Sequence, residues 1–117
     1  MGSYDRRARE MTEAVGEQPN ARVNLLRSKL AQARVFRGLD GASAREQVEG
    51  ILDEADRLVE ESGAIAFRPL ILEERGRMTN LAGDAERARR ELQDALIGYR
   101  EYSAAGHVAR LVRELGE

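Results

Sequence analysis

Residues 77–107 read RMTNLAGDAERARRELQDALIGYREYSAAGH and place the pair Gly83-Asp84 between two segments with apolar stripes. A second break of small residues follows at Ala105-Gly106. Apolar residues that recur every three or four positions indicate one face of a helix. In the second segment these are Ala88, Leu92, Ala95, Leu96, Tyr99 and Tyr102. The stretch therefore predicts two helices joined by a tight turn, and the fold depends on whether this hairpin repeats.

Glycine divides the rest of the chain at similar intervals. Gly16, Gly38, Gly63, Gly83 and Gly106 are separated by 22, 25, 20 and 23 residues. A glycine directly after a helix relieves the steric cost of a left-handed turn, so this spacing predicts successive helix ends. About six helices of roughly 11 to 20 residues result.

Apolar stripes fall between these glycines. They comprise Tyr4, Ala8, Met11 and Val15; Leu26, Leu30, Ala33 and Phe36; Ala44, Val48, Leu52, Ala55, Leu58 and Val59; and Val108, Leu111, Val112 and Leu115. No stretch alternates at period two over a useful length, as a strand would. The sequence therefore predicts an all-α fold.

Helix-capping residues support several of these borders. Ser43 and Glu46 have the spacing of a capping box, in which each side chain bonds the backbone of the other residue. Asp84 follows Gly83 and is expected to cap the next helix. Asp40-Gly41 is typical of a turn.

The hairpin repeats when the chain is shifted by 40 residues. The shift aligns Val48 with Ala88, Leu52 with Leu92, Ala55 with Ala95, and Val59 with Tyr99. One such unit cannot bury both of its apolar faces, so we expect neighbouring units to stack into a short right-handed solenoid.

We expect residues 1–117 to form a single helical-repeat domain. Its two units are approximately 21–63 and 64–105. A helix at 3–15 precedes them, and a capping helix at 106–116 follows.

The second unit resembles a tetratricopeptide repeat. Small residues let the two helices of that repeat approach closely, and Gly76, Ala88, Leu92 and Ala95 stand at matching spacings. The departures from the pattern are Leu72 for tryptophan, Arg75 for leucine, Thr79 for an aromatic residue and Arg100 for the closing proline. The period of about 40 also exceeds the usual 34. A HEAT-like repeat and a plain helical bundle remain alternatives.

Residues 62–116 also resemble the C-terminal helical tails of large bacterial multidomain regulators. The resemblance is carried by SGAIAFRPLILEERGRM, LAGD, RREL and GHVARLVREL. In those proteins a tetratricopeptide-like tail follows an ATPase module, sometimes with a nucleotide cyclase domain. The chain has no G-x-x-x-x-G-K-[ST] loop, so nothing in it resembles the ATPase itself.

Composition excludes several classes of function. The 117 residues carry a net charge of −2, so no basic field favours nucleic acid or an anionic membrane. No apolar run approaches the roughly 20 residues that span a bilayer. The absence of cysteine excludes disulfides and fits a reducing cytoplasm, where we expect the protein to reside.

Enzymatic chemistry has little support in the residues. His107 is the only histidine, and without cysteine no ordinary zinc cluster can form. We interpret His107 as a capping or surface residue. Adjacent carboxylates such as Glu73-Glu74 could serve acid–base catalysis, but they point about 100° apart on a helix and usually lie on a solvent-exposed face. We expect neither catalysis, nor a cofactor, nor a metal.

The resemblance to tetratricopeptide repeats implies a concave face formed by the first helix of each unit. Those helices are roughly 21–37 and 64–82, with Ala33 and Gly76 at the close-packing points. The polar residues expected to face the groove are Arg27, Arg34, Arg37, Glu73, Arg77 and Asn80. Four arginines against one glutamate predict a locally basic groove and a protein or peptide partner with an acidic segment or a C-terminal carboxylate.

The sequence therefore predicts a non-catalytic protein-interaction module, part of or related to a bacterial signalling protein. One alternative is a regulatory domain that senses a peptide or small molecule. Another is a structural unit that forms a homodimer through Tyr4, Ala8, Met11 and Val15.

Overall fold

The computed structural model describes residues 19–117, and this part of the chain is helical without strands. It contains five α-helices: α2 (Pro19–Asp40), α3 (Arg45–Ser62), α4 (Arg68–Leu81), α5 (Ala85–Glu101) and α6 (Ala105–Leu115). Two short 3-10 turns, Gly41–Ala44 and Ile65–Phe67, precede α3 and α4. The all-α prediction is confirmed for these residues. The expected sixth helix, 3–15, and the end predicted at Gly16 lie outside them.

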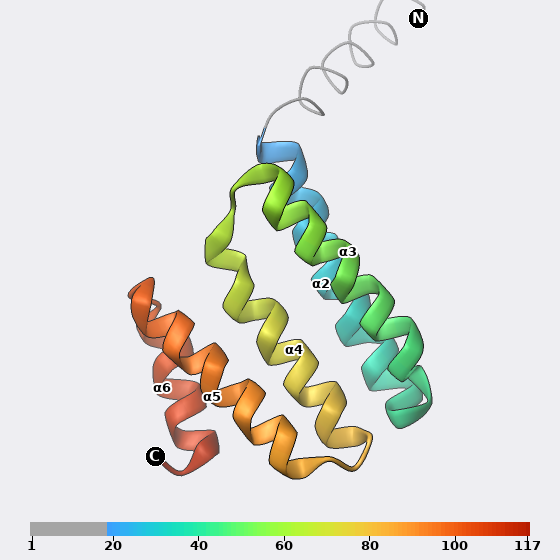
Figure 1. Cartoon of the computed structure of the whole chain (residues 1–117), viewed down its shortest axis with the longest axis vertical. Helices are drawn as coiled ribbons and strands as arrows, with labels where there is room; N and C mark the ends of the chain where they lie inside the picture. The colour runs from blue at the N-terminus through green and yellow to red at the C-terminus, as the bar shows by residue number, and fades with distance from the viewer. Residues whose placement is uncertain (1–18) are drawn as a thin grey trace, which may run out of the picture.

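The helices are arranged as consecutive antiparallel pairs (Figure 1). Helix α2 packs on α3, and α4 packs on α5. Helix α4 also contacts both α2 and α3, whereas α6 packs on α5 at the C-terminal end. The two pairs occupy nearly the ranges predicted for the two units. Helix α4 is thus the element that joins the N-terminal pair to the rest of the molecule.

Two apolar cores stabilise this arrangement. The first lies among α2, α3 and α4 and buries Leu26, Leu30, Ala33, Ala44, Val48, Leu52, Ala55, Val59, Ile71 and Met78. The second lies between α5 and α6 and buries Ala95, Leu96, Tyr99, Leu111 and Leu115. Leu70 of α4 packs against both cores. The stripes predicted within the described residues face the interior, except that Tyr102 is 41% exposed. Burial of these side chains is the main favourable contribution to folding.

Two glycines explain how closely α4 and α5 approach. A Cβ on Gly76 would lie 3.0 Å from the Leu92 side chain, which confirms the close packing predicted there. A Cβ on Gly98 would lie only 2.5 Å from Cγ of Pro69. The sequence offered no reason for Gly98, and the structure supplies one.

The helix ends agree with the glycine pattern at two of the four described positions. Gly63 and Gly83 follow α3 and α4 with φ angles of 74° and 98°, which glycine adopts at little cost. Gly38 and Gly106 lie inside α2 and α6, so the ends predicted there are wrong. The chain turns instead at Gly41 and Ser103, which have φ angles of 57° and 56°.

One predicted cap is present and one is not. The Asp84 side chain accepts a hydrogen bond from the Arg87 backbone N–H at 3.1 Å and caps α5. Ser43 instead donates to the Asp40 carbonyl at 2.7 Å, because the 3-10 turn places it before the start of α3. Ala44 holds the N-cap position of α3 without a side-chain bond, so the capping-box prediction is wrong.

Candidate functional site

Two consecutive glutamates on α4 are buried at the contacts of this helix with α2 and α6. Glu73 and Glu74 are 6% and 2% exposed. A buried carboxylate costs free energy unless charge partners and hydrogen bonds compensate. Both residues have such partners, but the partners come from different helices. The usual reading of adjacent carboxylates, a solvated face, therefore does not hold here.

Glu74 joins α4 to α2. Arg34 donates from Nε to Oε1 of Glu74 at 2.8 Å. Arg37 lies with Nε and Nη2 each 3.2 Å from Oε2. Two residues predicted to face a groove thus hold the first two helix pairs together.

Glu73 joins α4 to α5 and α6. Arg110 of α6 donates to both carboxylate oxygens, at 2.8 and 2.7 Å. Arg77 donates from Nη2 and Nε at 2.7 and 3.0 Å, and the Tyr99 hydroxyl donates at 2.8 Å. Burial alone would raise the pKa of Glu73, but the bonds from Arg110, Arg77 and Tyr99 outweigh it and lower the pKa to about 2.

Arg77 extends this network to the end of α6. Its Nη1 and Nη2 donate to Glu114 at 2.8 and 2.9 Å. Those bonds, with the ones to Glu73, raise the pKa of Arg77 above its ordinary value. They also lower the pKa of Glu114. Four of the five N–H groups of Arg77 are used within the protein, so it has little left to offer a ligand.

His107 belongs to the other end of this network. Its ring stacks on Tyr99 with centroids 4.5 Å apart, and its Nδ1 lies 2.8 Å from Nη2 of Arg110. Ala104 holds the N-cap position of α6, so His107 does not cap the helix. It is an exposed surface residue that supports Tyr99 and Arg110.

A groove of about 450 Å³ opens beside these joints, between the C-terminal ends of α2, α4 and α6 and the start of α5. Its apolar part is formed by Leu81, Ala85, Ala88, Leu92 and Leu115. Its polar part is formed by Arg37, Arg77, Asn80, Arg89 and Glu114. We call this cavity the α4–α6 groove.

The structure separates the six residues predicted to bind a partner. Arg37, Arg77 and Asn80 line the α4–α6 groove. Arg34 adjoins the groove only through its bond to Glu74, and Glu73 is buried in the ionic network. Arg27 lies elsewhere, with its guanidinium 5.9 Å from the ring centre of Phe67.

Several residues that were not predicted to belong to the site change the charge of this face. Arg89 lines the groove, and Arg110, Glu74 and Glu114 pair with predicted residues. Arg89 stood in a run of mixed charge that usually marks a solvated surface, although its position next to the buried Ala88 could have singled it out. Including Glu117 near Arg89, the face holds five arginines and four glutamates, so it is less basic than the six predicted residues alone suggest.

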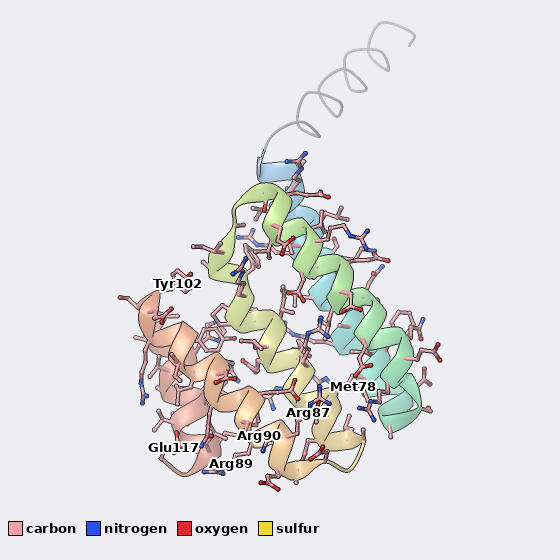
Figure 2. The ribbon with its side chains drawn as sticks, viewed as in Figure 1. Met78, Arg87, Arg89, Arg90, Tyr102 and Glu117 are labelled. Atoms are coloured by element: carbon pink, nitrogen blue, oxygen red, sulfur yellow. The ribbon has the colours of Figure 1, made fainter. Side chains whose placement is uncertain are left out.

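Three groove residues retain donors for a ligand. Arg89 donates from Nη2 to the Leu115 carbonyl at 2.9 Å and lies 4.0 Å from Glu117, near the C-terminus (Figure 2). Within residues 19–117, neither its Nη1 nor Nη1 of Arg37 makes a hydrogen bond. The Asn80 side chain makes none to these residues either. The groove therefore combines cationic and amide donors with an apolar wall.

Two other features were sought in the described part of the chain, a metal-binding cluster and a membrane-spanning helix. No cluster of three or more histidine, aspartate or glutamate side chains there could hold a metal ion. No helix from α2 to α6 has both the length and the apolar character needed to cross a bilayer.

Comparisons of the chain with family models, with curated proteins and with solved structures found no match.

Proposed function

We propose that this protein is a non-catalytic interaction module of tetratricopeptide type, whose α4–α6 groove binds a short segment of another protein. The observation that carries the proposal is the groove itself, with unused donors beside an apolar wall. Peptide sites commonly combine a few directed polar groups with apolar contact area.

The repeat supports this proposal. Helices α2 and α4 act as first helices of successive units, and α3 and α5 as second helices. Ala33 and Gly76 are both buried at equivalent places on the first helices. Helix α6 takes the place of a third first helix. An arginine of α2 binds Glu74 of α4, and in the same way an arginine of α6 binds Glu73 of α4. These three first helices, together with the start of the second helix α5, line the groove.

The chemistry of the groove favours a carboxylate ligand. Arg37 and Arg89 can each donate to an acidic side chain or a C-terminal carboxylate, and Asn80 can bond a peptide amide. An apolar side chain of the ligand would lie against Leu81 and Leu92, which line the same groove. Because most of the charge on this face is already paired, we expect modest affinity.

The cellular context rests on the resemblance of residues 62–116 to regulator tails. We propose that the module acts in the bacterial cytoplasm, within or beside a signalling protein that supplies the partner. A longer stack of units in such a protein would extend the groove and raise the affinity.

The test compares two neighbouring arginines on α5. The intact chain is used to recover binding peptides from a library with free C-terminal carboxylates, and the Kd of the best peptide is measured. Arg89→Glu should weaken binding by about tenfold or more, since it replaces a donor by a like charge. Arg90→Glu is the matched control, because Arg90 is 65% exposed in its side chain and, among residues 19–117, forms an ion pair only with Glu86.

The two variants separate binding from general electrostatics. Equal losses in both would mean that charge alone, and not the groove, attracts the peptide. Unchanged binding in Arg89→Glu, with helix content intact by circular dichroism, would move the interaction to another surface.

A further inference from the structure

The outer face of α2 carries apolar side chains that no described helix covers. Val35 and Leu39 are 56% and 75% exposed and lie on the side opposite the buried Leu26 and Leu30, whereas Leu25, 45% exposed, lines a pocket with Leu58 of α3. A contiguous exposed apolar patch usually marks an interaction site.

The repeat identifies what belongs on this face. Aligning Ala33 with Gly76 also aligns Leu26 with Pro69 and Leu30 with Glu73, and all six positions are buried. The same alignment places Val35 on Met78 and Gln32 on Arg75. On α4, Met78 is buried in the first core, and Arg75 donates to Asp53 and Asp56 of α3 at 2.7 and 2.8 Å. The exposed face of α2 therefore corresponds to the face of α4 that packs on the preceding helix.

The chain itself contains a segment with the pattern of that missing helix. The buried residues of α3 that follow the spacing i, i+4, i+7, i+11 are Val48, Leu52, Ala55 and Val59, and α5 repeats this spacing with Ala88, Leu92, Ala95 and Tyr99. Tyr4, Ala8, Met11 and Val15 have the same spacing. Val15 precedes Ser28 by 13 residues, and Val59 precedes the equivalent Ile71 by 12.

We propose that residues 3–15 form a helix that packs on the outer face of α2, as α3 packs on α4. Gly16 to Gln18 then form the turn, a length usual for paired helices. Met11 of this segment aligns with Ala55 and Ala95, which are each buried between two helices. A terminal helix contacts only one neighbour, so the larger side chain can be accommodated. The proposal rests on the repeat and not on the α4–α6 groove, so either can fail alone.

Cross-linking in the full chain tests the contact, and the absence of native cysteine makes this direct. The alignment places Thr12 where α3 has Asp56, and Gln32 where α4 has Arg75. Thr12→Cys with Gln32→Cys should form a cross-link within one chain when treated with a short bismaleimide. Thr12→Cys with Asp94→Cys, on the exposed side of α5, is the control and should not react within one chain.

Hydrogen exchange gives the second measurement. Val35→Glu should raise the exchange rate of amides in residues 3–15 by about tenfold, because it places a charge in the apolar contact. Ile97→Glu, at a position 54% exposed on α5, should leave those rates unchanged. Cross-links that form only between two chains would assign the face to a second copy and overturn the proposal. Cross-linking no faster than in the control, or rates equal in both glutamate variants, would also overturn it.

Discussion

Glu73 and Glu74 are neighbours in the sequence, yet they hold two different joints of the molecule. Glu74 binds two arginines of α2, and the side chain of one of them, Arg34, is 53% exposed. Glu73 binds arginines from α4 and α6 and the buried Tyr99 hydroxyl. The two joints also differ in the size of the apolar core beside them. Ten buried residues stabilise the N-terminal side, whereas five stabilise the C-terminal side.

Charge matters more for stability where the adjoining apolar core is smaller. Where α2, α3 and α4 bury a continuous core, the ionic bond to Glu74 adds to contacts that already hold the helices. Helix α6 has only two buried apolar residues, Leu111 and Leu115, so the ionic network around Glu73 fixes α6 against α4. The α4–α6 groove lies on the joint that depends more on charge.

The largest expected effect is the loss of the Glu73 carboxylate. Glu73→Gln should lower the free energy of unfolding by about 3 kcal/mol, since two arginines and Tyr99 lose their ionic acceptor. Glu74→Gln should cost about 1–2 kcal/mol, because Arg34 and Arg37 can turn to water. Urea unfolding of both variants measures the difference. A cost for Glu74→Gln equal to or above that of Glu73→Gln would break the comparison.

Overpacking of α5 should have a smaller effect. Ala88 and Ala95 are 2% and 0% exposed. Replacing either with leucine should cost about 1–3 kcal/mol, because the added atoms find no space. Ala109→Leu on the exposed side of α6 is the control and should change stability by about 0.5 kcal/mol or less. Unchanged melting temperatures in both α5 variants would mean that α5 is not closely packed.

The smallest expected effects come from two glycines within helices. Gly98→Ala should lower the free energy of unfolding by about 1 kcal/mol, since the new Cβ meets the rigid ring of Pro69. Gly50→Ala should raise it by about 0.5–1 kcal/mol, because no atom lies within 4 Å of the new Cβ and alanine favours the helix. Thermal unfolding of the two variants should therefore show shifts of opposite sign, and shifts of one sign would contradict the α4–α5 geometry.

Local patterns in the sequence were sufficient for the helices and their inner faces. Val48, Leu52, Ala55 and Val59 are buried as predicted, because helical periodicity determines which side chains share a face. The exact ends were less predictable. Gly38 continues α2, since a glycine permits a helix end without requiring one.

The candidate site was predicted only in part, because it depends on contacts between distant residues. Arg37, Arg77 and Asn80 were predicted to face one groove, and in the structure they line the same cavity. Their partners could not be predicted, since Glu74 lies 37 residues from Arg37, and Glu114 lies 37 from Arg77. Glu73 and Glu74 look like a solvated pair in sequence, and only the packing of α2 and α6 on α4 buries them.

The ionised carboxylate of Glu73 holds the C-terminal joint, and the pH dependence of the free energy of unfolding tests this most directly. The folded protein lowers the pKa of Glu73 from 4.5 to about 2. The stabilisation is therefore fully present above pH 4.5 and is lost as the pH falls towards 2. We predict that wild type exceeds Glu73→Gln in unfolding free energy by about 3 kcal/mol at neutral pH and by about half as much near pH 3. A difference that stays constant between these pH values would mean that ionisation of Glu73 does not hold the joint.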